Sequence, residues 1–324
     1  MRTSADPAIP SSLRSARSVG VAVAIASAVF FGGSGPFAKP LITAGLSPLQ
    51  VAWLRLAGGA VLMLPLLVRH LGVPRRSPGV LVGYGLFAVA GVQVCYFAAI
   101  ATVPVGVALL IEFLGPVIVL GWIRFARRKP VSRSATTGVV LAVVGLVFVV
   151  ELWSGLSFNP IGLLFGLGAA CCQATYFLVA DSADHVDPLA LAGYGLLVGT
   201  FAVALIARPW EIDWTLLAGD VVMAGHQVPA LLAVGWIVAF STVLAYLTGI
   251  IAVRRLSPQV AGGVAFLEPV VAAVLAWALL SEELGPMQLV GGALILVGAY
   301  IAQRAAPNAE PDLGPLQAAD EGGR

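Results

Sequence analysis

The chain has 324 residues, of which 59% are hydrophobic and only 10% are charged, and its formal net charge at pH 7 is +2. Soluble domains average about 25% charged and about 45–50% apolar residues. This composition therefore excludes a water-soluble globular protein, because one core of this size could not bury so much apolar surface. The small net charge says little about partners and gives no reason to expect binding of nucleic acid.

Apolar stretches long enough to cross a hydrocarbon layer of about 30 Å follow one another along the whole chain. Lipid cannot satisfy free backbone N–H and C=O groups, so such stretches must be helices or strands of a closed barrel. Barrel strands alternate polar and apolar residues, and runs such as 139–150 do not alternate. The sequence therefore predicts an all-α polytopic membrane protein. Its ten transmembrane helices are expected near 19–41, 48–69, 79–101, 103–123, 134–151, 160–180, 188–208, 228–252, 258–280 and 286–303.

The two ends of the chain are polar. The first apolar stretch follows Arg14 and Arg17 but has no clean small-residue cleavage site, so it is interpreted as a retained helix and not as a signal peptide. Residues 1–18 and 304–324 are rich in Ala, Pro, Ser and acidic residues and are expected to be disordered tails. The three cysteines lie within predicted helices and lack C-x-x-C spacing, which predicts neither a disulfide framework nor a metal site.

Lys and Arg gather on one side of the predicted helices. The segments on that side hold Arg2, Arg14, Arg17, Arg69, Arg75, Arg76, Arg124, Arg127, Arg128, Lys129, Arg133, Arg254, Arg255, Arg304 and Arg324. The opposite side has only Lys39 and Arg208 near its ends. By the positive-inside rule both termini are cytoplasmic, and the expected location is the cell (inner) membrane. The connection around Asp187 belongs to the cytoplasmic side but lacks Lys and Arg, and acidic residues count little in that rule.

A shift of 153 residues aligns the second half of the chain with the first. It places Pro116 on Pro269, Gly138 on Gly291 and Gly145 on Gly298. Chance matches between apolar residues would not align Pro and Gly at three separated positions. A repeat of five helices puts its second copy upside down in the membrane, and inverted repeats are a transporter architecture with the substrate site near the midplane. The sequence predicts two such repeats, 19–151 and 160–303.

Several motifs resemble those of a known family. In the second half these are Phe266-Leu-Glu-Pro269, Leu280-Ser-Glu-Glu-Leu-Gly285, Gly291 and Gly298, and in the first half Ala38-Lys39, Leu54-Arg-Leu56, Val103-Pro-Val-Gly-Val107 and Glu112-Phe-Leu-Gly-Pro116. On these motifs the chain, over about residues 20–303, resembles the EamA domain of the drug/metabolite transporter superfamily, and its first half is similar to the threonine/homoserine exporter branch. The resemblance implies a ten-helix fold, a substrate cavity between the halves and a peripheral last helix in each half. One departure is that the first half has Arg127-Arg-Lys129 where the second has Ser281-Glu-Glu283.

Two carboxylates lie about the middle of predicted helices, Glu112 in the fourth and Glu268 in the ninth. An ionisable group at that depth costs about 2.5–3.5 kcal/mol on insertion scales, and it usually marks a pathway or a buried pair. In the repeat alignment the two acids are offset by three positions, close to one helical turn, so they occupy similar faces. We expect them to bind a substrate ammonium group or to exchange a proton during transport, the alternative being a buried structural acid.

Other polar residues within the helices are candidates for the same site. Arg55 either binds a substrate carboxylate through its planar fork or snorkels to the outer interface or pairs with a glutamate. Lys39, near the outer end of the first helix, is either a site cation or an interface residue or gate. Neutral candidates, which either line the site or bond between helices, are Gln93, Tyr96, Gln173, Tyr176 and Tyr246. The run 32–36 predicts a break in the first helix that either exposes backbone groups to substrate or packs against a neighbour.

The sequence gives no support for an enzyme. It contains no GxxxxGK[ST] nucleotide loop, no HExxH and no Gly-x-Ser-x-Gly elbow, and its histidines are too dispersed for a metal site. No cofactor is expected; the expected partners are a small-molecule substrate and the lipid bilayer, with protons as a candidate coupling ion. The leading hypothesis is a secondary transporter that exports amino acids or related metabolites by alternating access. The alternatives are an exporter or importer of another solute, such as a drug-like cation or a nucleotide sugar, and a membrane scaffold or sensor without flux.

Overall fold

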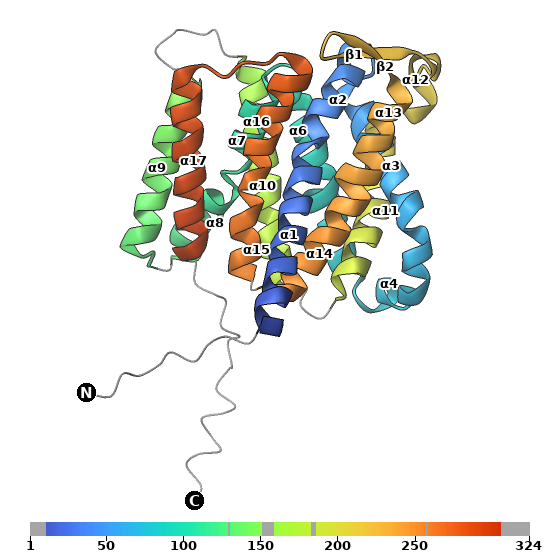
Figure 1. The fold of residues 1–324 in the computed structure, drawn as a ribbon. Coiled ribbons are helices and arrows are strands. Elements are labelled where there is room, and N and C mark those ends of the chain that lie inside the picture. The colour runs from blue at the N-terminus through green and yellow to red at the C-terminus, as the bar shows by residue number, and fades with distance from the viewer. Residues whose placement is uncertain (1–10, 129, 151–158, 183–185, 257, 306–324) are drawn as a thin grey trace, which may run out of the picture.

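The computed structural model describes residues 11–128, 130–150, 159–182, 186–256 and 258–305, which form a bundle of helices (Figure 1). The elements of the first half are α1 Ser11–Gly32, α2 Ser34–Thr43, α3 Pro48–Leu67, η1 Val68–His70, α4 Val73–Arg76, α5 Pro78–Gly83, η2 Tyr84–Gly91, α6 Val92–Ile100, α7 Val105–Glu112, α8 Gly115–Phe125 and α9 Arg133–Val150. Those of the second half are α10 Pro160–Ser182, α11 Pro188–Ala207, η4 Pro209–Glu211, α12 Thr215–Ala218, β1 Asp220–Met223, β2 His226–Pro229, α13 Ala230–Gly235, η5 Trp236–Leu244, α14 Ala245–Arg255, α15 Pro258–Ala265, α16 Leu267–Leu280 and α17 Pro286–Ala305.

Nine helical segments within the described ranges are long and apolar enough to cross a membrane, which confirms a polytopic helical membrane protein. They are Ser18–Thr43, Pro48–His70, Pro78–Ile100, Val105–Phe125, Arg133–Val150, Pro188–Ala207, Ala230–Arg255, Gly262–Leu280 and Pro286–Arg304. The remaining predicted helix is α10, of which Pro160–Thr175 is a further apolar helical stretch. The weakly marked division between the third and fourth predicted helices is present, since α6 ends at Ile100 and α7 begins at Val105.

Helix boundaries differ from the predicted ones at three places. Helix α1 begins at Ser11, directly after Pro10, so the predicted N-terminal tail is too long by eight residues, 11–18; these lack Pro and Gly and continue the helix. The C-terminal helix likewise runs on to Ala305. The predicted helix 228–252 begins only at Ala230, because 226–229 form β2 in an antiparallel hairpin, and it extends to Arg255.

Three of the membrane helices are interrupted near their middle. The segment Ser18–Thr43 breaks between α1 and α2 at Gly33, as the glycine-rich run predicted. The segment Val105–Phe125 breaks between α7 and α8, and Gly262–Leu280 breaks between α15 and α16. A proline follows the start of each second segment (Pro36, Pro116 and Pro269), and its missing N–H weakens the helical ladder. Glu112 is the last residue of α7, and Glu268 is the second residue of α16. Both predicted carboxylates therefore lie at breaks, where transporters expose backbone groups.

Two helices contain π-helical turns at corresponding positions. These are η2, within the segment Pro78–Ile100, and η5, within the segment Ala230–Arg255. The 153-residue shift places 84–91 on 237–244, so both turns occupy the same part of each half. Such turns are found mostly at functional sites. The sequence did not predict them, because both segments consist of ordinary helix-compatible residues.

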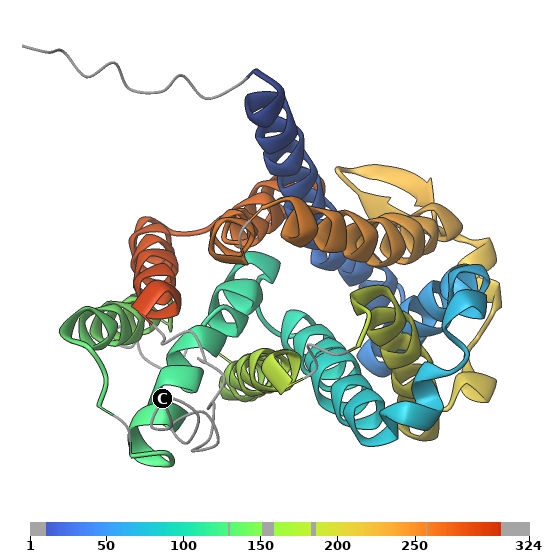
Figure 2. The same cartoon turned by 90° about the horizontal axis from the view of Figure 1, so that it is seen from below.

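Helices α9 and α17 form a close pair at one edge of the bundle (Figures 1 and 2). A Cβ atom added at Gly138 would lie 2.6 Å from Gly298 O, and one added at Gly145 would lie 2.6 Å from Gly291 O. The two backbones therefore touch, and only glycine fits at these four positions. Helix association in membranes commonly relies on such small-residue faces.

The end of the bundle that carries the β hairpin lies opposite the start of α1 and the end of α17 (Figure 1). The turn of the hairpin is formed by Ala224 and Gly225, both with positive φ, and Ala224 N–H donates to Leu279 O at 2.6 Å. The hairpin is thereby fixed to the end of α16. We call this the outer end after the orientation expected from the positive-inside rule, since the arginine-rich helix ends lie at the opposite end of the bundle (Figure 1).

Candidate functional site

Glu112 is buried at the end of α7 and faces α10. Only 6% of its surface is exposed, and Gln173 Nε2 of α10 donates to Glu112 Oε1 at 3.4 Å. Gly115 gives this amide room, because a Cβ there would collide with Gln173 Oε1. Two residues predicted separately, Glu112 and Gln173, thus form one polar group across the two halves of the chain.

The breaks that carry the two carboxylates meet each other. Phe113, directly after Glu112, packs edge-on against Phe266, two residues before Glu268, with ring centroids 5.5 Å apart. Glu268 lies in the first turn of α16, and its carbonyl oxygen is 2.8 Å from the position of a Cβ at Gly32 of α1. The helices that carry Glu112 and Glu268 therefore bring their breaks into one region, next to the break between α1 and α2.

Arg55 is buried, with 2% of its surface exposed, and its guanidinium joins three helices. It donates from Nη1 to Ser34 Oγ, from Nε to Thr242 Oγ1 at 3.0 Å and from Nη2 to Ser241 O at 2.8 Å. In the described part of the chain it makes no ion pair with a glutamate, so neither snorkelling nor a glutamate pair accounts for it. Arg55 instead connects the first half to the π-helical turn of the second.

The binding partner of Arg55 on η5 follows from the geometry of that turn. At its end the backbone N–H of the C-cap Ala245 donates to both Phe240 O and Thr242 O, and Ser241 lies between these two residues in the sequence. A change from the wide π ladder to the α ladder passes over one carbonyl, which then needs another donor. Arg55 supplies this donor, and Thr242 Oγ1 in turn donates to Ile237 O at 2.7 Å.

The neutral candidates occupy different positions. Gln93 Oε1 is buried and has no hydrogen-bond partner within the described residues, which marks it as available to a ligand. Tyr96 is buried and its hydroxyl faces Gly35 so closely that a side chain there would not fit. Tyr246 packs edge-on against Phe31 at 5.2 Å. The side chain of Tyr176 lies outside the described residues, so its predicted role is not addressed.

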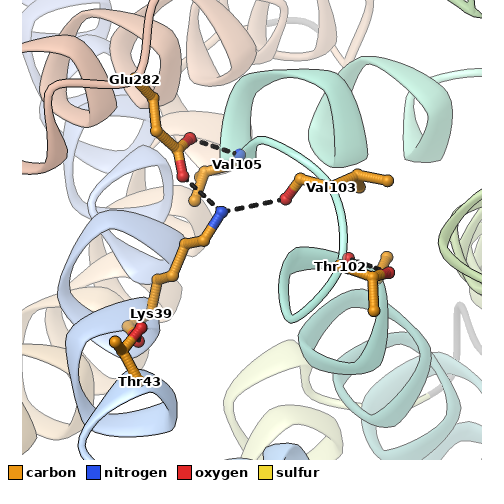
Figure 3. Close-up of polar contacts among 7 residues, drawn as sticks. Lys39, Thr43, Thr102, Val103, Val105 and Glu282 are labelled. Atoms are coloured by element: carbon orange, nitrogen blue, oxygen red, sulfur yellow. Dashed lines mark hydrogen bonds and ion pairs between the residues drawn. The ribbon is translucent and has the colours of Figure 1, made fainter. Parts of the chain in front are cut away.

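Lys39 connects three segments near the outer end of the bundle (Figure 3). Its ammonium forms an ion pair with Glu282 and donates to Val103 O at 3.1 Å, while Val105 N–H donates to Glu282 Oε2 at 2.8 Å. Both charged side chains are largely buried, with 22% and 15% exposed. We call this group, Lys39, Glu282 and the Val103 and Val105 backbone, the outer latch. The sequence suggested Lys39 as a gate but missed Glu282, although its acidic loop was recognised as present in one half only.

Asp187 lies at the end of the connection that lacks Lys and Arg, and its partners come from elsewhere in the chain. It caps α11 by accepting from Leu189 N–H at 2.8 Å, and it pairs with Arg254 Nη2 at 2.8 Å and with the His70 ring at 3.8 Å. Partial burial acts to raise the pKa of Asp187, but the Leu189 N–H and the Arg254 guanidinium together hold it below its ordinary value. Arg254 and His70, from other parts of the chain, thus lie against the carboxylate of Asp187. Within the described residues there is no cluster of His, Cys, Asp or Glu that could hold a metal ion.

Comparison with known proteins decides the family. The model of the EamA-like transporter family matches residues 18–151 and again 160–303. The chain belongs to the EamA-like transporter family. This confirms the resemblance drawn from the motifs and establishes a multi-span membrane transporter, not an enzyme.

Individual relatives agree with the family. The chain is 34% identical over 271 residues to the threonine/homoserine exporter RhtA of Escherichia coli (strain K12), covering 81% of this chain and 84% of that one. It is 28% identical over 290 residues to an uncharacterized transporter of Archaeoglobus fulgidus, covering 88% and 96%. A solved crystal structure with 18% identity and a TM-score of 0.56 covers 90% of this chain and 99% of that chain, which shows a shared fold.

Proposed function

We propose that this EamA-like transporter exports small amino acids of the threonine/homoserine type by alternating access around a midplane site between its halves. The observation that carries the proposal is the buried Glu112, which meets Gln173 of the second half at a break in its own helix. Glu112 and Glu268 bind the substrate ammonium or exchange a coupling proton, and the unpartnered Gln93 Oε1 adds an acceptor. The name of the 34% identical relative, an exporter of threonine and homoserine, supports the substrate class.

Contacts between α9 and α17 support two inverted repeats of five helices, 19–151 and 160–303. Gly138 meets Gly298, and Gly145 meets Gly291, so the two helices run in opposite directions. In the 153-residue alignment Gly138 corresponds to Gly291 and Gly145 to Gly298. Exchanging the halves therefore turns each contact into the other, as expected of surfaces related by a two-fold axis. For antiparallel membrane helices such an axis lies in the membrane plane, and α10 is then the tenth crossing.

The outer latch supports a conformation that is closed towards the outside. The arginine-rich helix ends lie at the other end of the bundle, which supports a cytoplasmic location for both termini. Export then requires a step in which Lys39 and Glu282 separate and the substrate leaves past them. A midplane site closed on one side is the arrangement that alternating access needs.

Transport by purified protein in proteoliposomes tests the proposal. Labelled L-threonine should exchange across the membrane, faster with a pH gradient if protons are coupled, and Glu112→Gln should reduce the flux at least tenfold. Glu211→Gln is the matched control, because Glu211 is an exposed acid of the outer loop paired with Arg208. Flux in Glu112→Gln equal to that of the control would refute the role of Glu112. No flux and no thermal stabilisation by any amino acid would favour another solute or a scaffold.

A further inference from the structure

A pocket of about 490 Å³ opens beside the outer latch. Its walls are the end of α2, the β1–β2 hairpin and the loop after α16, and its charged groups are Lys39, Asp220 and Glu282. The volume is within the roughly 300–1,000 Å³ of small-molecule pockets. Neither Glu112 nor Glu268 is among the residues that line this pocket.

The backbone fixes the acidic wall of the pocket. Helix α16 ends at Leu280, its C-cap Ser281 has a left-handed φ of 56°, and Glu282 N–H donates to Ala276 O at 3.2 Å. This helix-ending turn satisfies a carbonyl of the last turn and directs the following residue. The hairpin is held to the same helix end through Ala224 and Leu279. The carboxylates of Glu282 and Asp220 are thus carried by one rigid unit that faces Lys39 of α2.

The chemistry of the latch selects its ligand. When Lys39 and Glu282 separate, each leaves a charge that is largely removed from water, and an unpaired buried charge is costly. A cation would satisfy Glu282 but leave Lys39 alone, and an anion would do the reverse. A zwitterion carries both complementary charges and satisfies both groups at once. The latch therefore opens at least cost for a ligand with an ammonium and a carboxylate on one small molecule.

We propose that this pocket is an outer release subsite for zwitterionic α-amino acids, in which the substrate carboxylate binds Lys39 Nζ and the substrate ammonium binds Glu282. Asp220 provides a second carboxylate for the ammonium as the substrate moves outwards. The substrate thereby exchanges partners with the latch and opens it. This subsite rests on the proposed export function for its place in the transport cycle, but its binding chemistry can be measured without transport.

Calorimetric titration of the purified full-length protein in detergent tests the subsite. The Glu112→Gln background removes the midplane carboxylate, and the probes are L-threonine, the cation L-threoninamide and the anion N-acetyl-L-threonine. We expect L-threonine to bind at least tenfold more tightly than either singly charged probe. Lys39→Gln and Glu282→Gln should each weaken L-threonine binding about tenfold to hundredfold, as expected for loss of a charge-assisted hydrogen bond. Glu283→Gln, beside Glu282 but outside the pocket lining, should change it less than twofold.

Three results would overturn the subsite: no binding of L-threonine, equal binding of the three probes, or equal effects of Glu282→Gln and Glu283→Gln. If a latch variant fails to fold, Asp220→Asn replaces it, because Asp220 lies on the exposed hairpin and leaves the latch intact. We expect a severalfold loss of binding there, and an unchanged affinity would count against the proposal. If the unmodified protein transports no L-threonine in proteoliposomes but L-threonine binding in the Glu112→Gln background still depends on Lys39 and Glu282, the export function alone is refuted.

Discussion

The most direct test of the architecture is to add one methyl group at the contact between α9 and α17. In Gly145→Ala the new Cβ would lie 2.6 Å from Gly291 O and 2.7 Å from Ile295 N, both backbone atoms that cannot rotate away. Ordinary contact begins at 3.4 Å, so the helices must separate locally by about 0.8 Å. Overpacking of this kind costs about 1–3 kcal/mol. Alanine favours a helix over glycine by up to about 1 kcal/mol, so the net loss should be about 0–3 kcal/mol, and about 1–3 kcal/mol relative to an alanine that meets no neighbour.

The assay is equilibrium unfolding in detergent, with Gly121→Ala as the control. Gly121 lies in membrane helix α8, and a Cβ there meets nothing within 4 Å. The control should therefore be neutral or slightly stabilising. If Gly145→Ala matches Gly121→Ala, the close contact of α9 and α17 is refuted.

The repeat makes the test sharper. Gly138 and Gly291 correspond in the two halves, as do Gly145 and Gly298, so each corresponding pair should lose a similar free energy on change to alanine. The free-energy losses of two glycines that touch each other should not add, whereas those of distant glycines should. Once Gly138→Ala has separated the helices, Gly298→Ala at the same contact should add little, because residues in contact are not additive. Unequal losses within the corresponding pairs would contradict the two-fold relation.

Three further predictions concern the polar groups. Arg55→Lys keeps the charge but loses the guanidinium fork that joins three helices, so it should lower the free energy of unfolding by about 3 kcal/mol. The exposed Arg208→Lys is the control and should leave that free energy unchanged. If Arg55→Lys is as stable as Arg208→Lys, the connecting role of Arg55 is refuted. Gly115→Ala should displace the Gln173 amide and reduce L-threonine efflux with little loss of stability, and unchanged efflux would argue against this amide. Asp187→Asn keeps the cap but removes the carboxylate charge, and it should cost less than about 1 kcal/mol because the ion pair is exposed. Since the pKa of Asp187 is lowered in the folded protein, this difference should stay constant from pH 7 down to about 4 and vanish only at lower pH. Melting temperatures across that range measure it, and a difference already lost at pH 5 would contradict the lowered pKa.

Hydropathy and helix-breaking residues were sufficient to predict most of the fold. The break at 32–36 and the turn between Ile100 and Val105 follow from local chemistry, because Gly and Pro act on their own helix whatever surrounds it. The π-helical turns and the outer hairpin were not predicted. A π turn depends on what packs against the helix, as Arg55 does against Ser241 O, and no local residue type encodes this.

The same distinction holds for the site. Glu112, Gln173 and Arg55 were recognised because a polar side chain at membrane depth is conspicuous in an apolar sequence. Which of these side chains bond to each other or to other residues was not predicted, since pairing depends on which helices are neighbours. Arg55 was expected to bind a substrate carboxylate, to snorkel to the outer interface or to pair with a glutamate, and its bonds to Ser34, Thr242 and the Ser241 carbonyl were not predicted. Glu282 was hidden for another reason: it lies in a loop, where an acidic residue is unremarkable.

The outer latch also explains why the two halves need different sequences on a similar backbone. Arg128, three residues after α8 ends at Phe125, has a φ of 52°, and Ser281, the C-cap of α16, has a φ of 56°; the 153-residue shift places one on the other. The next position is Lys129 in the first half and Glu282 in the second. In an inverted repeat the first turn faces the cytoplasm, where positive charge is favoured, and the second faces outwards, where it is not. In the sequence, a cation thus stands in the first half at the position where the second half has the carboxylate of the latch. If the halves are inverted, the sequence does not offer a carboxylate at this position on the cytoplasmic side, and we expect the two gates of an alternating-access cycle to close by different chemistry.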